Sequence, residues 1–179
     1  TLSEFTCYQS YRYAMNFAVD RAYIADNILN GSAVTATLPI LPENSLYNTD
    51  LASRYNFDLD NARRLFSDAG VRDYDEDGML EYQLPGGNAK IDLDFIVCSD
   101  NTDKVKAAQK IAADLESIGI GVTVRQVNWM EYVYCITNGE YDMFYGEVKL
   151  PADFNPTDLI TTNGVKNFFG INDPNYYEY

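Results

Sequence analysis

The stretch DYDEDGMLEY places oxygen ligands at the spacing of a calcium-binding loop. Counted from its first residue, carboxylates stand at loop positions 1, 3, 5 and 9. These carboxylates belong to Asp73, Asp75, Asp77 and Glu81. Gly78 supplies the bend, but position 12, where an EF-hand has a bidentate Glu, is Leu84. The stretch therefore begins as a calcium loop and lacks its closing ligand.

Two interpretations of this stretch follow from its residues. In the first, the four carboxylates bind Ca²⁺, and the chain is a small calcium-binding module of a cell-surface protein. In the second, the aspartates accept backbone N–H bonds in an Asx-type turn that joins a helix to a strand. An alternating strand pattern follows the loop where an EF-hand has its second helix. We therefore predict the turn and keep calcium as the alternative.

The absence of histidine limits the catalytic chemistry of the chain. Ser-His-Asp and Cys-His nucleophile systems and HExxH zinc sites all need histidine, so they are excluded within these residues. The sequence also has neither a GxxxxGK[ST] phosphate loop nor a GxGxxG fingerprint. An acid-pair glycosidase stays open, because 27 Asp and Glu residues offer many carboxylate pairs. We predict that the chain is not an enzyme and has no cofactor, apart from the calcium alternative.

The formal net charge of -14 limits the partners of the chain. A field of this sign repels phosphate backbones and anionic lipids, so we expect no binding to nucleic acid or to a membrane surface. No apolar run approaches the roughly 20 residues of a membrane span. Three widely separated cysteines, Cys7, Cys98 and Cys135, form no recognisable metal or disulfide pattern, and we expect them to be small buried apolar residues.

Apolar periodicity predicts the elements that position the acidic loop. The predicted helices span residues 11–29, 59–69, 102–118 and 129–138, and the predicted strands span residues 80–84, 91–98, 122–127 and 142–150. The second strand, the third helix and the third strand form a βαβ unit, whose strands are normally parallel. From Pro151 onward the pattern is loop-like. The fold class is therefore α/β, with helices packed on a mostly parallel mixed sheet, as a single domain over residues 1–179.

Several stretches, in this order and spacing, resemble one family from Tyr11 to Tyr176. They are YRYAMNFAVDRAYIADNILNG, YNFDLDNARRLFSDAGVRDYDEDGMLEY, KIAADLESIGIGVTV and NWMEYVYCITNGEYDMFYGEV. The family is the bacterial extracellular solute-binding proteins of family 5, which serve ABC importers of oligopeptides, dipeptides and nickel. The resemblance implies a type II periplasmic-binding-protein-like lobe.

The resemblance also implies how such a protein works. Two lobes close about a hinge on a small solute or short peptide, and the closed form docks on ABC permease subunits. The protein is extracytoplasmic, either periplasmic or anchored as a lipoprotein on the cell surface. Family members are around three times as long as this chain, which would be most of the second lobe without the first. We expect the fragment itself to be monomeric.

The resemblance points to a ligand-binding segment in KLPADFNP. The family has a W-x-A-D-Y-x-D-P-like segment whose Asp pairs with the terminal amine of a peptide, and Asp153 falls at that position. We predict that Asp153, Phe154 and Asn155 contact the ligand. The segment departs from the family pattern, because Lys149 or a neighbour stands where Trp is usual and one residue is missing. The alternative for Asp153 is a cap or a solvated loop position, and the sequence does not identify the solute.

Overall fold

A three-stranded parallel sheet organises the computed structural model, which describes residues 8–38, 40–149 and 157–167. The middle strand β3 (Asp92–Cys98) pairs in parallel with β4 (Gly121–Val127) on one side and with β5 (Met143–Tyr145) on the other. Helix α6 (Thr102–Ser117) connects β3 to β4, so the predicted βαβ unit is confirmed. The α/β fold class is confirmed with it.

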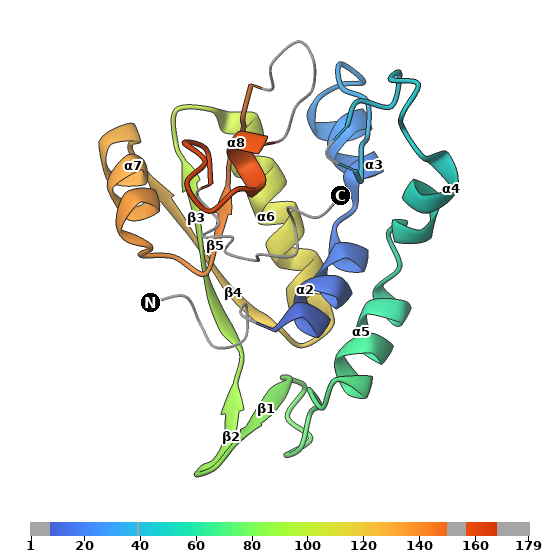
Figure 1. Ribbon diagram of the computed structural model, residues 1–179. Coiled ribbons are helices and arrows are strands. Elements are labelled where there is room, and N and C mark those ends of the chain that lie inside the picture. The colour runs from blue at the N-terminus through green and yellow to red at the C-terminus, as the bar shows by residue number, and fades with distance from the viewer. Residues whose placement is uncertain (1–7, 39, 150–156, 168–179) are drawn as a thin grey trace.

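Both faces of β3 are covered, because helices lie on each side of the sheet (Figure 1). The side chains of Leu93, Phe95 and Val97 belong to the main core, together with the apolar face of α6. Ile96 points to the other face and packs with Cys135 of α7 (Trp129–Asn138). The strand is therefore apolar along most of its length, as is usual for parallel strands covered on both sides.

The main core is completed by the N-terminal helices and by α5 (Leu59–Asp68). Asp58 caps α5, since its carboxylate accepts the N–H of Asn61 at 2.8 Å. Ala62 and Phe66 of α5 are fully buried against the core. The short elements α4 (Thr49–Ala52) and η3 (Ser53–Tyr55) precede α5.

The predicted continuous helix over residues 11–29 is wrong, because the chain breaks at Val19. The structure has four short pieces in this region: α2 (Gln9–Met15), η1 (Asn16–Ala18), α3 (Arg21–Tyr23) and η2 (Ile24–Ile28). Val19 is extended, with φ -107 and ψ 107, and Asp20 starts a new helix by accepting the N–H of Tyr23 at 2.9 Å. The Arg21 guanidinium bridges the break by donating to the backbone oxygen and side chain of Asn16.

The antiparallel part of the structure is a separate hairpin rather than a part of the main sheet. Strands β1 (Glu81–Leu84) and β2 (Gly87–Lys90) pair with each other and form a two-stranded sheet. Within the described residues the three-stranded sheet is entirely parallel, and the antiparallel pairing of this mostly parallel architecture lies in the hairpin. The predicted strand over residues 142–150 is confirmed only for β5, and α8 (Thr157–Ile160) lies in a region predicted as loop.

Two of the three cysteines are placed by the structure. Cys98 and Cys135 are buried with free thiols, as predicted, while Cys7 lies outside the described residues. Among the helices of the described ranges, none combines the length and apolarity needed to cross a membrane.

Candidate functional site

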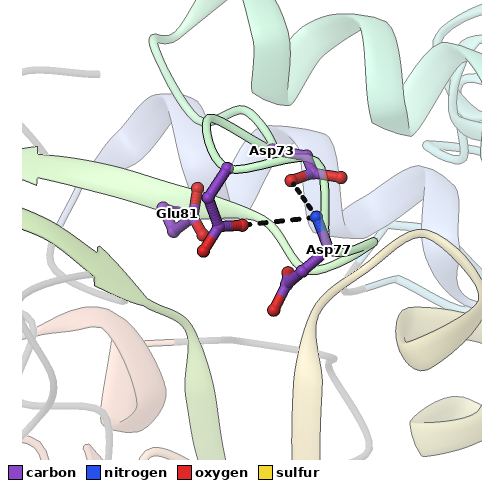
Figure 2. A group of neighbouring side chains, drawn as sticks. Asp73, Asp77 and Glu81 are labelled. Carbon is purple, nitrogen blue, oxygen red and sulfur yellow. Dashed lines mark hydrogen bonds between the residues drawn. The ribbon is translucent and has the colours of Figure 1, made fainter.

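The acidic loop between α5 and β1 brings the four predicted carboxylates together. Ligand atoms of Asp73, Asp75, Asp77 and Glu81 all lie within 4.8 Å of one another. In Figure 2 a dashed line joins the Asp73 carboxylate to the backbone N–H of Asp77, which also donates to Asp75, and the Glu81 side chain lies nearby. The predicted cluster of side chains therefore exists in the structure.

Backbone N–H groups are the main partners of the aspartates. The Asp73 carboxylate accepts from Asp77 N at 3.1 Å and from Gly78 N at 2.8 Å, and Asp77 Oδ1 accepts from Met79 N at 3.0 Å. The predicted Asx-type turn is confirmed by these hydrogen bonds. Gly78 has φ +93, so it provides the predicted bend in the left-handed region.

A cation of the chain itself already contacts this cluster. Lys90 Nζ donates to Asp77 and lies 3.7 Å from Asp75. This hydrogen bond holds the pKa of Asp77 below its ordinary value and raises the pKa of Lys90. Glu81 is buried, and its carboxylate accepts from Tyr74 N at 2.7 Å. A calcium ion at this place would compete with Lys90 and with backbone donors for the same oxygens. Calcium binding by the loop stays the alternative interpretation.

Lys90 was missed by the sequence reasoning, although a signal for it exists. The turn at residues 85–86 reverses the chain, and the resulting register places Lys90 directly opposite Glu81. Opposite charges facing each other across a hairpin are a common stabilising pair. Extending the strand pattern beyond the turn would have placed the lysine beside the aspartates.

The carboxyl edge of the parallel sheet is the second candidate site. All three strands end there, and α6 and α7 begin there with Asn101 and Asn128 as caps. In open α/β sheets, ligands bind in the crevice outside the carboxyl ends of the strands. The Lys104 ammonium at the start of α6 lies 2.9 Å from the Glu147 carboxylate just after β5. The edge thus combines two helix N-termini with a charged pair.

An apolar groove lies beside this edge, between α7 and the end of β5. The α7 groove has a volume of about 410 Å³, and its walls include Trp129, Tyr132, Val133, Ile136, Phe144 and Val148. The rings of Trp129 and Tyr132 stack with their centroids 5.9 Å apart. Tyr132 is half-buried, whereas Trp129 is 59% exposed, so Tyr132 is the one of the two that packs inward.

Tyr132 ties α7 to the end of β5. Its hydroxyl donates to the backbone oxygen of Tyr145 at 2.9 Å. Burial raises the pKa of Tyr132 to about 12, so the hydroxyl keeps its proton and remains a donor at neutral pH.

The predicted ligand contacts Asp153, Phe154 and Asn155 lie outside the described residues. The chain that leads to them leaves from the carboxyl end of β5. A hydrogen bond joins the described residues on either side of this segment: Lys166 Nζ donates to the backbone oxygen of Lys149 at 2.8 Å.

A family model, curated relatives and solved structures all match this chain. The family model described as bacterial extracellular solute-binding proteins, family 5 middle, matches residues 4–167. A probable di/tripeptide-binding protein 5 of Pseudomonas aeruginosa is 27% identical over 134 residues, covering 75% of this chain and 22% of that protein. Heme-binding protein A of Haemophilus influenzae is 26% identical over 133 residues, covering 72% of this chain and 21% of that protein.

A solved structure shares the fold. The oligopeptide-binding protein AppA of Bacillus subtilis, in complex with a nonapeptide, has a TM-score of 0.83 at 21% identity. The match covers 97% of this chain and 35% of the AppA chain. This chain therefore spans about a fifth of the curated relatives and about a third of the solved structure. Since the family model covers most of its residues, the chain belongs to the bacterial extracellular solute-binding proteins of family 5.

Proposed function

We propose that the chain is a solute-binding lobe of an extracytoplasmic receptor that delivers its ligand to an ABC importer. Residues 1–179 would form a single domain, most of the second lobe, with the first lobe supplied by the rest of the protein. The observation that carries the proposal is the family match over residues 4–167. The carboxyl edge of the parallel sheet supports it, because this is where such sheets offer a ligand surface.

The mechanism follows from dividing the ligand contacts between two lobes. Contacts made by both lobes exist only in the closed state, so ligand binding shifts the receptor population from open to closed. The closed receptor would then dock on permease subunits. The lobe performs no chemistry and needs no resident cofactor under this proposal, and the full protein would be periplasmic or anchored by a lipid.

Peptide is the solute class that we propose, with Asp153 as the partner of its terminal amine. A carboxylate in a closing cleft is shielded from water, so a charged hydrogen bond to an ammonium group is stronger there than at a surface. Phe154 and Asn155 would contact the adjoining part of the ligand. The names of the relatives support this class in part, since one is a probable di/tripeptide-binding protein and AppA was solved with a nonapeptide.

Titration calorimetry on the full-length receptor tests this proposal. Asp153→Asn should weaken the binding of a free-amine peptide at least about tenfold, which corresponds to about 1.4 kcal/mol. Asp158→Asn is the matched control, because Asp158 is an exposed carboxylate in the first turn of α8 and its loss should leave affinity unchanged. Equal affinities of the wild type and Asp153→Asn would contradict the assigned role of Asp153, and no binding of any peptide by the wild type would contradict the solute class.

A further inference from the structure

The outer face of α7 differs from the outer faces of the other long helices. Large apolar side chains are exposed along it: Trp129 is 59% exposed, Met130 81%, Val133 42% and Tyr134 56%. The outer faces of α5 and α6 instead carry charged residues, including Arg64 and Lys106. A helix that is apolar on all sides is normally buried. The composition of α7 is therefore that of an interior helix.

The single charged residue of α7 does not change this outer face. The Glu131 carboxylate lies 3.8 Å from the Arg125 guanidinium on β4. Arg125 in turn bonds Asp94 at 2.7 Å and the backbone oxygen of Glu140 at 2.9 Å. The charges near α7 are thus used to attach the helix to the sheet, and its exposed stripe stays apolar.

Two hollows flank this stripe. One has a volume of about 320 Å³ and is lined mainly by Trp129, Met130, Val133 and Tyr134. The other is the α7 groove, which reaches the end of β5 and shares Trp129 and Val133 with the first. The stripe and both hollows, which Thr137, Asn138 and Glu147 also line, form one mainly apolar surface, here named the α7 surface.

On the sheet side, α7 contributes only a small buried cluster. Ile96, Cys135 and Tyr141 are its buried members, with Tyr132, Ile136 and Phe144 partly buried around them. The α6 side of the sheet, by contrast, is covered by several helices (Figure 1). Within the described residues the buried layer on the α7 side is thin, and the outer face of α7 stays exposed.

We propose that the α7 surface is covered by a segment of the full-length receptor that lies outside these 179 residues. The chain spans only 35% of the solved AppA chain, so the family supplies ample polypeptide for this purpose. The covering segment would be apolar where it meets Trp129 and Met130. The proposal rests on the place of this chain within a longer receptor, and it holds for any solute class.

Other occupants fit the surface less well. A second copy would bring another formal charge of -14 against the first, and the two would repel each other. A small solute is normally enclosed over most of its surface, whereas Met130 and Tyr134 project from the outer side of a helix. A continuous apolar stripe along a helix is instead the shape that a second packed element fills.

Substitutions in the full-length receptor test the proposal. Met130→Lys places a charge on the α7 surface, and if that surface is buried in the receptor the melting temperature should fall by about 3 °C or more. Gln109→Lys is the matched control on α6, where the side chain is exposed and the melting temperature should change by less than about 1 °C. On the same variants, light scattering measures the molecular mass and peptide titration measures the peptide affinity.

Each outcome decides the proposal. A lower melting temperature with unchanged mass and unchanged peptide affinity supports a covering segment within the same chain. Dissociation of a dimer by Met130→Lys would assign the surface to a second copy and overturn the proposal. A loss of peptide affinity with an unchanged melting temperature would assign the surface to the ligand, and equal behaviour of the two variants would mean that the surface is open to solvent. Failure of the solute proposal alone would leave the thermal result unaffected.

Discussion

At the acidic loop, Lys90 reaches the alternating aspartates from the second strand of the hairpin. The spacing of Asp73, Asp75 and Asp77 was enough to predict that their carboxylates gather, because they lie in one short turn. The spacing did not show which cation they face. That contact depends on the hairpin register, which pairs residues from two different strands.

The pH dependence of Asp77 is the first prediction at the scale of single residues. Its pKa is lowered in the folded protein from 3.8, mainly by the Lys90 hydrogen bond, so the ionised form stabilises the fold at neutral pH. That stabilisation is present above the unfolded pKa and is lost as the pH falls through the folded pKa. Asp77→Asn should therefore melt below the wild type at pH 7, and the difference should shrink as the pH falls below 3.8.

Thermal melts between pH 7 and pH 2 measure this effect. Asparagine keeps an oxygen that can accept the N–H of Met79 but replaces the oxygen that accepts from Lys90, so the substitution removes the bond to Lys90 together with the charge. The pair is exposed to solvent, and its contribution should also weaken at high salt. An Asp77→Asn variant at least as stable as the wild type at pH 7 would show that repulsion among the aspartates outweighs the bond to Lys90.

A calcium titration separates the two interpretations of the loop. With its carboxylates bonded to backbone N–H groups and to Lys90, the loop should show no change in melting temperature between excess Ca²⁺ and chelator. If calcium instead binds the folded state alone, saturation at a hundred times the dissociation constant would add about 2.7 kcal/mol of stability. A clear rise in melting temperature with Ca²⁺ would therefore favour the calcium alternative.

At the scale of elements, apolar periodicity correctly predicted the central strand and the long helix that follows it. The strand at residues 91–98 and the helix at residues 102–118 match β3 and α6 closely, because both bury a regular apolar face. The helix predicted over residues 11–29 has the same kind of face but breaks at Val19. Apolar spacing reports which side chains are buried, and it does not report a backbone break that leaves buried residues on both sides of it.

Two helix ends provide an element-scale prediction. Gly139 ends α7 with φ +67 and has open space where a side chain would project, so Gly139→Ala should cost about 1 kcal/mol from backbone strain alone. Gly119 follows α6 with φ +92, and an added Cβ would lie 2.7 Å from the backbone oxygen of Gly78. Gly119→Ala should therefore cost about 3 kcal/mol, since it adds a backbone clash to the strain.

Urea unfolding of the two glycine variants checks this difference. Gly139→Ala serves as the control for the conformational cost, because nothing lies within 4 Å of the added carbon. Equal destabilisation by both substitutions would mean that the approach of α6 to the acidic turn is looser than the structure shows.

At the scale of the whole molecule, the order of stretches along the chain predicted more than any single residue did. The family resemblance from Tyr11 to Tyr176 is confirmed by the family match over residues 4–167. The predicted contacts at Asp153, Phe154 and Asn155 remain predictions, because they lie outside the described residues. The sequence also did not indicate that α7 exposes Trp129, since burial of a helix face depends on which elements pack against it.

The isolated 179-residue chain provides the prediction at this scale. If it is one lobe of a receptor that closes on its ligand, about half of the ligand contacts are missing from it. Titration calorimetry should then show no peptide binding at micromolar affinity or better. A tight complex of the isolated chain would mean that it carries a complete pocket of its own, contrary to the two-lobe proposal.

The central position of β3 has a consequence for how the chain opens. Its backbone is bonded to β4 on one side and to β5 on the other, and helices cover both of its faces. Amide protons of β3 can therefore reach water only when the sheet as a whole comes apart, whereas those of the β1–β2 hairpin need only a local fluctuation. Deuterium uptake in β3 would thus give the stability of the entire sheet, measured from within a single strand.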